Sequence, residues 1–223
     1  AYIVSQPCSQ TRKKVERNIG IINIITSILY SSNIEIFKYA LDKEISNVAK
    51  FWGAEVPFIR PAELAQDNST TFSVIEHALN WLEERQNYVP DYLILLEPTS
   101  PLRDATDVER AFDQLKQSKA SSIVGICLTE VQHPVFMYLK NDSGKLKPYL
   151  NNSEKVIRRQ DLEQTYFLEG SIYISQTQVL LEEKTFYHGN TIGYEVPKWK
   201  SPEIDEEIDF LLAEVIMKHK NFK

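Results

Sequence analysis

The sequence has little cysteine and no long apolar run, and both absences narrow what the protein can be. Its 223 residues include two cysteines, Cys8 and Cys127, without the paired spacing of a zinc site. We therefore expect a reducing compartment rather than a disulfide scaffold. No apolar run reaches the length that spans a bilayer, and the first residues lack the charged-then-apolar layout of a secretory signal. We expect a cytoplasmic protein that does not enter a membrane.

An excess of positive charge is also missing. The chain has 25 Lys and Arg against 31 Asp and Glu, a net charge of −6, which argues against a general nucleic-acid binder. An acidic protein that handles anionic small molecules needs local basic groups and usually a metal. The hydrophobic fraction of 43% is ordinary for a globular protein. The length fits a single domain over residues 1–223 with a sizeable insertion.

The clearest element is the apolar run from Tyr92 to Leu96. It predicts a strand buried on both faces, as inside a parallel sheet. The run stops at Glu97-Pro-Thr-Ser-Pro101, where two prolines disfavour helix at the residues before them. This turn would sit at the carboxyl end of the strand, where open α/β sheets bind ligands. Taken alone, the same residues fit a plain turn equally well.

Strands and helices alternate along most of the chain, which predicts a doubly wound α/β sheet. Strands are expected at 1–4, 34–41, 91–96, 121–128, 170–174 and 193–196. Helices are expected at 21–30, at 44–51, from Ser69 or Thr70 to about Arg85, after an N-cap at Thr106, and over 210–215. Residues 133–150 fit a β-hairpin around Asn141-Asp-Ser-Gly144, with exposed aromatic residues that could face a partner subunit.

Two polar segments could bind an anion or a hydroxyl. Asp67 and Ser69 come just before a helix, where capping is enough to explain them. Arg158 and Arg159, beside Gln160, can bind a carboxylate bidentately. A surface arginine pair is more often simply solvated, so these residues need a site around them before they indicate function.

A third segment is acidic. Glu203 and Asp205 flank Ile204, so an extended chain projects both carboxylates to one face. Two hard oxygen ligands on one face suit Mg²⁺ or Mn²⁺ bridging nucleotide phosphates. The alternative is an acidic first turn that favours the following helix.

Taken together and in order, these segments resemble the acylneuraminate cytidylyltransferases. That family includes the CMP-sialic acid synthetases and their relatives for legionaminic and pseudaminic acids. The resemblance runs from about residue 20 to 216, and the order and spacing of the motifs make it specific. The motifs are Gly53-Ala-Glu-Val-Pro-Phe58, Arg60-Pro-x-Glu-Leu-Ala-x-Asp67, Leu96-Glu-Pro-Thr-Ser-Pro-Leu-Arg103, Arg158-Arg-Gln160 with Gly170-x-Ile-Tyr173, and Glu203-Ile-Asp205.

The resemblance implies a Rossmann-like nucleotidyltransferase fold and a homodimer in which an excursion at about 130–167 makes contacts between subunits. It also implies transfer of CMP from CTP to a nine-carbon 2-keto-3-deoxy acid sugar, with a divalent metal and release of pyrophosphate. By the same resemblance, the nucleotide-binding residues are Ser9, Arg12, Arg17, Asn18, Pro98, Thr99 and Ser100. The substrate-binding residues are Arg103, Arg158, Arg159, Gln160, Glu169 and Tyr173, and the metal ligands are Glu203 and Asp205. No side chain stands out as a general base.

The chain departs from the family at the phosphate-binding loop. The family's first strand runs into a loop whose glycines let backbone amides approach the triphosphate, but this chain has no glycine before Gly20 and places Pro7 in that stretch. Arg12 and its basic neighbours can replace charge but not backbone geometry. A catalytically impaired homologue that keeps the fold and binds sugar acid or a protein partner therefore stays open. So does a nucleotidyltransferase for another nucleotide or sugar.

Overall fold

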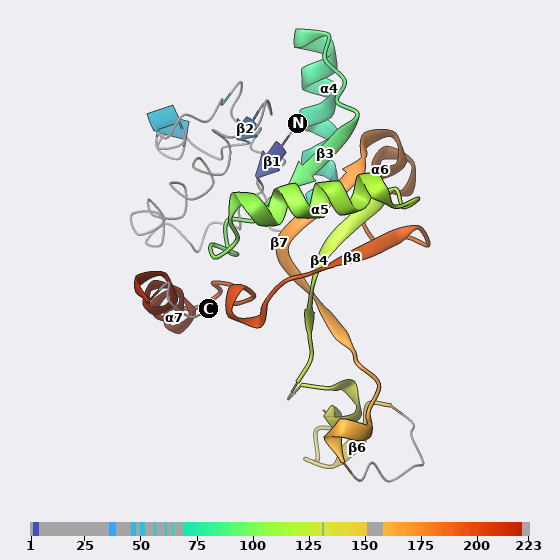
Figure 1. The fold of residues 1–223 in the computed structure, drawn as a ribbon, viewed down its shortest axis with the longest axis vertical. Coiled ribbons are helices and arrows are strands. Elements are labelled where there is room, and N and C mark those ends of the chain that lie inside the picture. The colour runs from blue at the N-terminus through green and yellow to red at the C-terminus, as the bar shows by residue number, and fades with distance from the viewer. Residues whose placement is uncertain are drawn as a thin grey trace.

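The computed structural model describes residues 2–4, 36–38, 46–47, 50–51, 56, 61, 64, 69–130, 132–150 and 158–219. A six-stranded sheet runs through them in the order β2-β1-β3-β7-β4-β8 (Figure 1). Its strands are β1 (Tyr2–Val4), β2 (Ile36–Lys38), β3 (Tyr92–Leu95), β4 (Ser122–Leu128), β7 (Tyr166–Gln176) and β8 (Thr191–Glu195). A separate antiparallel pair joins β5 (Tyr138–Lys140) to β6 (Leu146–Pro148).

The main sheet is mixed but mostly parallel. β1 runs parallel to β2 and β3, and β4 runs parallel to β8. β7 lies antiparallel between β3 and β4, so it is the strand that reverses direction in the middle of the sheet. The predicted strands at 1–4, 34–41, 91–96, 121–128 and 193–196 are confirmed in the described residues. The strand expected at 170–174 is longer than predicted.

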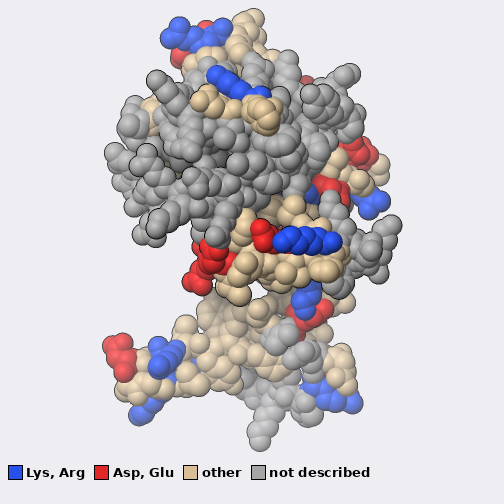
Figure 2. Space-filling view, turned by 90° about the vertical axis from the view of Figure 1, so that its left-hand side faces the viewer, with Lys and Arg blue, Asp and Glu red and all other residues tan. Residues whose placement is uncertain are grey.

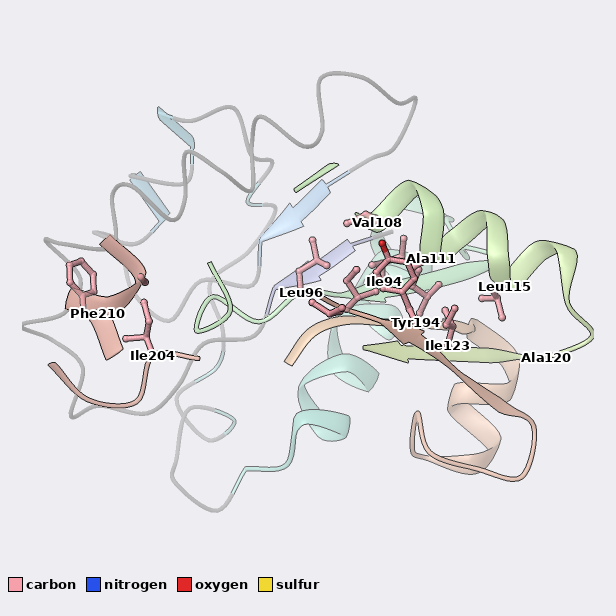
Figure 3. Packing of buried hydrophobic residues seen from close by; sticks show 14 residues of the cluster. Ile94, Leu96, Val108, Ala111, Leu115, Ala120, Ile123, Tyr194, Ile204 and Phe210 are labelled. Atoms are coloured by element: carbon pink, nitrogen blue, oxygen red, sulfur yellow. The ribbon is translucent and has the colours of Figure 1, made fainter. Parts of the chain in front are cut away.

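Helices cover both faces of the sheet, which confirms the doubly wound α/β prediction. On one face, α5 (Ala105–Gln117) packs Val108 and Leu115 against Ile94 and Ile123 of the strands (Figure 3). On the other face lie α4 (Thr71–Gln86) and α6 (Thr177–Glu183). Their buried side chains include Ile75, Leu79 and Leu180, which pack with Leu93 and Leu95 of β3.

β3 explains this two-sided packing. Successive side chains of a strand point to opposite faces, and in β3 both sets are apolar: Leu93 and Leu95 face α4 and α6, whereas Ile94 faces α5. All three are at most 5% exposed. Burying such side chains contributes about 1.5–3 kcal/mol each. The apolar run that dominates the sequence is therefore the centre of the core.

The ends of α4 agree with the prediction, but the start of α5 does not. Thr70 caps α4 by accepting a hydrogen bond from the Ser73 amide at 3.1 Å. The expected N-cap of α5, Thr106, is wrong, because Asp104 caps the helix instead. Asp104 Oδ1 accepts from the Asp107 amide at 3.2 Å, and Asp107 Oδ2 accepts from the Asp104 amide at 2.9 Å. This reciprocal pair satisfies two helix-end donors at once.

Several elements complete the structure. α7 (Glu207–Lys218) is the predicted last helix, extended at both ends, whereas α6 was not predicted. Short 3₁₀ turns lie at Pro134–Phe136 (η3), Arg159–Asp161 (η4) and Lys198–Lys200 (η5). Of the helix expected at 44–51, the described residues 46, 47, 50 and 51 are helical. The helix expected at 21–30 lies outside the described residues. Among those described, no helix is long and apolar enough to cross a membrane.

The excursion between β4 and β7 projects away from the sheet (Figure 1). It contains the β5–β6 hairpin around a turn at Asn141–Gly144, which confirms the hairpin prediction. Many of its apolar side chains are exposed, with Leu146 at 64% and Tyr149 at 59%. In Figure 2 the described residues in the lower part of the molecule, which holds the excursion, are mainly uncharged, with charged residues of both signs toward the margins.

Candidate functional site

The turn after β3 is closed by one buried arginine. Arg103, 2% exposed, donates from Nη1 to the carbonyl oxygens of Glu97 at 2.7 Å and of Ser100 at 2.8 Å. The Ser100 amide also donates to the Glu97 carbonyl, at 3.3 Å. Pro98 and Thr99 are partly exposed on this turn, and Ser100 is buried. The prediction of a rigid turn at the carboxyl end of the strand is therefore confirmed.

The acidic segment lies directly beside this turn. The Ile204 amide donates to the Thr99 carbonyl at 2.8 Å, and the Gly170 amide of β7 donates to Glu203 Oε1. Ile204 is buried, Glu203 is partly exposed and Asp205 is exposed, as expected for alternation along an extended chain. The structure thus joins two sequence motifs that are about a hundred residues apart.

Gly170 leaves room for this contact. A Cβ atom at position 170 would lie 2.8 Å from Glu203 Oε1 and 3.0 Å from Ser100 Oγ, so the Glu203 side chain would have to shift away from the strand. The absence of a side chain lets the carboxylate reach the backbone amide of the strand. The Gly170 of the sequence motif therefore has a direct structural reason.

Negative charge accumulates around the two motifs. Burial raises the pKa of Glu97, and the nearby charges of Glu203 and Asp205 raise it further against the opposing effect of Arg103. Burial also raises the pKa of Glu169 to about 7, with Glu203 adding to the shift and the hydrogen bonds from Ser171 opposing it. Carboxylates that disfavour one another's ionisation are relieved by a cation among them.

A divalent cation fits this donor set. Within the described residues no three His, Cys, Asp or Glu side chains form a group that could hold a metal ion. Two carboxylates nevertheless suit Mg²⁺, which commonly takes its other ligands from water and substrate phosphates. Glu203 and Asp205 are the residues that would hold it, since Glu203 is oriented by Gly170 and Asp205 is exposed.

A cavity of about 170 Å³ opens on the other side of Glu97. Its walls include Phe72, Leu95, Glu97, Tyr173, Phe186 and Tyr187. The Tyr173 ring packs on Phe186 with centroids 5.4 Å apart, and on Tyr187 with centroids 6.2 Å apart. Burial, together with Tyr187, raises the pKa of Tyr173 well above its ordinary value, so its hydroxyl stays protonated. The cavity has mainly apolar walls with a few hydroxyl groups and two charged residues, Glu97 and Lys184, as ligand pockets usually have.

Two predicted substrate-binding residues lie beneath the surface of the site. Glu169 is 1% exposed and accepts hydrogen bonds from the Ser171 amide and hydroxyl. The Arg103 guanidinium is buried, which lowers its pKa to about 10. Its Nε and Nη2 atoms, like Ser100 Oγ, are buried without a hydrogen-bond partner in the described part of the chain. Direct contact of Arg103 or Glu169 with a substrate stays a prediction.

The structure does not bring Arg158 or Gln160 to the turn after β3. Both are exposed and belong to the excursion, which projects away from the sheet (Figure 1). Arg158 pairs with Asp161, with Nε 2.9 Å from Oδ2. Of Arg159 only the backbone, in η4, is described. The predicted nucleotide-binding residues Ser9, Arg12, Arg17 and Asn18 lie outside the described residues.

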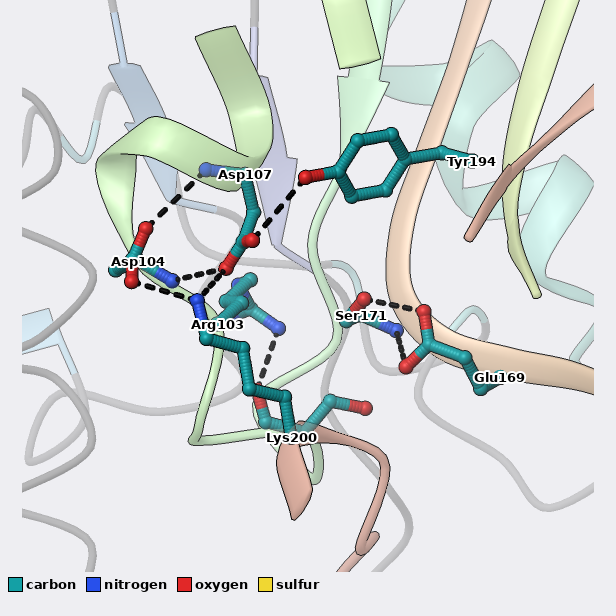
Figure 4. A network of polar contacts seen from close by, with 8 residues as sticks. Arg103, Asp104, Asp107, Glu169, Ser171, Tyr194 and Lys200 are labelled. Carbon is teal, nitrogen blue, oxygen red and sulfur yellow. Dashed lines mark hydrogen bonds and ion pairs between the residues drawn. The ribbon is translucent and has the colours of Figure 1, made fainter. Parts of the chain in front are cut away.

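A buried polar network next to the site was not predicted (Figure 4). Lys200, 6% exposed, binds Asp104 and Asp107. Tyr194 donates to Asp107 Oδ1 at 3.2 Å. The pairing of Asp104 with Asp107 three residues later is the spacing of a capping box and could have been found in the sequence. Lys200 carried no such signal, because a lysine is normally at the surface.

Sequence comparisons find relatives that include two named cytidylyltransferases. The post-translational flagellin modification protein B of Campylobacter coli is 29% identical over 215 residues, covering 93% of this chain and 90% of that protein. The pseudaminic acid cytidylyltransferase of Campylobacter jejuni is 26% identical over 213 residues, with the same two coverages. An N-acylneuraminate cytidylyltransferase of Streptococcus agalactiae is 29% identical over 153 residues, covering 69% of this chain and 35% of that protein. No protein-family model matches the chain.

Solved structures share the fold at low sequence identity. CMP:2-keto-3-deoxy-manno-octonic acid synthetase complexed with CTP has a TM-score of 0.64 at 10% identity, covering 99% of this chain and 98% of that one. The 4-diphosphocytidyl-2C-methyl-D-erythritol synthase of Anaerococcus prevotii has a TM-score of 0.63 at 10% identity, covering 97% and 95%. The chain therefore has the α/β fold of these two enzymes, and its sequence is similar to those of N-acylneuraminate and pseudaminic acid cytidylyltransferases.

Proposed function

We propose that the protein transfers CMP from CTP to a nine-carbon 2-keto-3-deoxy acid sugar and releases pyrophosphate. The observation that carries this proposal is that hydrogen bonds attach the acidic segment at 203–205 to Thr99 of the turn after β3 and to Gly170 of β7. It brings a rigid polar turn and a pair of carboxylates to the carboxyl end of β3, where α/β sheets bind nucleotides. The relatives named above include enzymes that transfer cytidylyl groups to acids of this class.

In the proposed reaction the anomeric hydroxyl of the sugar attacks the α-phosphorus of CTP, and the bond from that phosphorus to pyrophosphate breaks. The turn of Pro98, Thr99 and Ser100 forms one wall of the nucleotide site, held rigid from inside by Arg103. Glu203 and Asp205 hold Mg²⁺ or Mn²⁺. When bound, such a cation neutralises phosphate charge and helps to ionise the attacking hydroxyl. The hydrogen bond from Gly170 fixes Glu203 before substrate arrives.

The sugar acid is proposed to bind on the Tyr173 side of Glu97. The cavity there offers aromatic walls for apolar substituents of a sugar and hydroxyl groups for its polar ones. Its position beside the turn would place a bound sugar next to the nucleotide, so that binding supplies proximity.

The carboxylate of the sugar is proposed to meet Arg158, Arg159 and Gln160 of a second subunit. The excursion exposes apolar surface that suits contact with another copy of the chain. It carries Arg158 and Gln160 and projects away from the sheet of its own chain. A homodimer would supply both the covering surface and the missing arginines. The low cysteine content supports a cytoplasmic location.

The test is to incubate the protein with CTP, Mg²⁺ and a panel of sialic, legionaminic and pseudaminic acids and to measure pyrophosphate. The expected result is release with at least one acid of the panel and none without sugar. Silence across the whole panel would overturn the enzymatic proposal. Replacing CTP by ATP, GTP or UTP tests the choice of nucleotide.

A second candidate function rests on the missing glycines before Gly20. If that stretch does not bind triphosphate, the chain is a homologue that keeps the fold and binds a sugar acid or a protein partner. Isothermal titration calorimetry with CTP separates the two candidates. No CTP binding by a folded protein favours the second candidate, and micromolar to millimolar binding favours the enzyme.

A further inference from the structure

Lys200 is buried, whereas every other lysine whose side chain the structure describes is exposed. Its ammonium nitrogen lies 2.6 Å from Asp104 Oδ2 and 2.6 Å from Asp107 Oδ2, and Figure 4 shows it pointing into the start of α5. Lysine is almost never fully buried unless paired, because removing its charge from water is costly. The two carboxylates offset that cost only while this geometry is kept.

The partners of Lys200 are themselves rigid. Asp104 and Asp107 form the capping box of α5, and Tyr194 of β8 donates to the other oxygen of Asp107. Burial alone would raise the pKa of Asp104, but the hydrogen bond and charge of Lys200, together with hydrogen bonds from the backbone amides of Asp107 and Thr106, lower it. Lys200 therefore attaches its own segment to the fixed end of a helix, and that helix begins just after Arg103 of the turn.

The segment that carries Lys200 leads straight to the acidic pair. Upstream, the Val196 amide donates to the Ile126 carbonyl at 2.8 Å; downstream, the Ile204 amide donates to the Thr99 carbonyl. Between these two backbone attachments Lys200 supplies a buried side-chain attachment, three residues before Glu203. Lys200 therefore fixes the path of the chain between these two attachments, and the position of Glu203 depends on that path.

Lys198, two residues earlier in the same 3₁₀ turn, provides the contrast. It also forms an ion pair, with Glu130, but its side chain is 63% exposed and that of Glu130 is 50% exposed. Exposed ion pairs contribute little to stability. Two lysines of one turn thus have the same charge and opposite environments, which makes Lys198 a matched control.

We propose that Lys200, through Asp104 and Asp107, is the positioning residue of the acidic segment. It locks residues 201–205 against α5 so that Glu203 and Asp205 face the turn after β3. Lys200 does not touch the reacting atoms. This inference rests on the proposed function in that Glu203 and Asp205 are taken as the metal ligands.

The first experiment compares Lys200→Met, Lys200→Arg and Lys198→Met in binding Mn²⁺, followed by electron paramagnetic resonance in the presence of CTP. Residues that orient metal ligands typically change metal affinity by about 10- to 100-fold when replaced. We expect that loss for Lys200→Met and recovery of most of it in Lys200→Arg. Lys198→Met should stay within about threefold of the parent protein. Equal affinities for Lys200→Met and the parent would overturn the proposal.

Steady-state kinetics distinguish a positioning role from a loss of stability, because only the first makes kcat depend on the Mg²⁺ concentration. At saturating Mg²⁺ the kcat of Lys200→Met should recover toward that of the parent, whereas at low Mg²⁺ it should be depressed. A deficit in kcat that Mg²⁺ does not relieve, with unchanged Mn²⁺ affinity, would assign Lys200 a purely structural role.

Amide hydrogen exchange tests the positioning without any activity or metal. The amides of Gly170 and Ile204 report the two contacts of the acidic segment. In Lys200→Met both should exchange faster than in Lys198→Met, while amides of β3 keep their protection. Unchanged protection at both amides overturns the proposal even if the parent protein binds no Mn²⁺, a result that by itself would refute only the metal site.

A milder variant guards against misfolding of Lys200→Met. Asp104→Asn keeps a capping side chain but removes one of the two charges on Lys200, and its side chain is 54% exposed. We expect the same faster exchange at Ile204, to a smaller extent. Protection equal to the parent in this variant would contradict the proposal.

Discussion

The turn that follows β3 and the excursion that follows β4 leave the sheet at the same end, because β3 and β4 both run antiparallel to β7. The turn is closed over its own polar groups, with Arg103 bonded to two of its carbonyls and Ile204 bonded to a third. The excursion instead exposes its apolar side chains, Leu146 and Tyr149 among them. The turn satisfies its polar groups within a single chain, whereas the excursion leaves an exposed apolar surface that a partner could cover.

This difference indicates how the proposed site is divided. The carboxylates and the turn are preorganised by contacts within the chain, as electrostatic stabilisation of a reaction requires. In the proposed site, the arginines of the excursion would reach a substrate bound to a second chain. Changes in the turn should therefore alter chemistry directly, whereas changes in the excursion should act through assembly.

The largest expected effect comes from Glu203→Gln. The glutamine oxygen can still accept the hydrogen bond from the Gly170 amide, so the segment should keep its place, but the negative charge is lost. We expect kcat for pyrophosphate release to fall by about 100-fold or more. The control is Glu207→Gln, an exposed acid in the first turn of α7. Comparable activity in both variants would remove Glu203 from the site.

Next in size is a pH effect at Glu169. Its pKa is about 7 in the folded protein, above the ordinary 4.5, so the folded state holds a proton that the unfolded chain releases. The free energy of unfolding of the metal-free protein should therefore fall as pH rises from about 4.5 to 7. The fall should reach about 3 kcal/mol at most.

Urea unfolding at pH 5 and pH 8 measures this fall, and Glu169→Gln is the comparison. The variant has no proton to lose at this position, so its stability should change less between the two pH values. Groups such as Asp104, whose pKa is lowered, act in the opposite direction in both proteins and cancel in the difference. Parallel pH dependence of the parent and the variant would refute the assignment to Glu169.

An intermediate effect is expected in the excursion. Leu146→Asp places a charge on its exposed apolar surface and should weaken dimerisation by about 2 kcal/mol, about a 30-fold rise in Kd. Lys147→Asp is the control, because neighbouring side chains of β6 point to opposite faces. Sedimentation equilibrium gives both values. A parent protein that is monomeric at the concentrations of the activity assay, yet active, would show that the excursion serves another purpose.

The sequence could predict features that depend on neighbouring residues, but not features that depend on contacts between distant ones. The apolar run of β3 and the prolines after it are local signals, and they predicted the strand and the rigid turn. The spacing of Glu203 and Asp205 is also local, and it predicted the alternation around Ile204. Lys200 could not be recognised, since its burial depends on Asp104 and Asp107, more than ninety residues away. α6 was missed because its seven residues follow β7 without a Ser, Thr, Asp or Asn at the N-cap, where Gln176 stands.

The N-cap of α5 shows that even a local signal does not always predict a single outcome. Both Asp104 and Thr106 are good capping residues, and propensity alone does not choose between them. The reciprocal bonds between Asp104 and Asp107 decide the choice, and Lys200 reinforces it. Where two local solutions are nearly equal in energy, a distant side chain can select one of them.

The smallest expected effect separates the two regions most clearly. Gly144 in the hairpin turn has φ of +80° with nothing within 4 Å of an added Cβ, so Gly144→Ala brings backbone strain of about 1 kcal/mol and no clash. The strain should appear locally, as roughly fivefold faster exchange of the Asn141 amide, which donates to the Lys145 carbonyl at 3.1 Å. Global unfolding in urea should change little if the excursion opens independently of the sheet. If the free energy of global unfolding instead fell by the full 1 kcal/mol, the hairpin would unfold together with the core, and the division between a self-contained site and a separate excursion would fail.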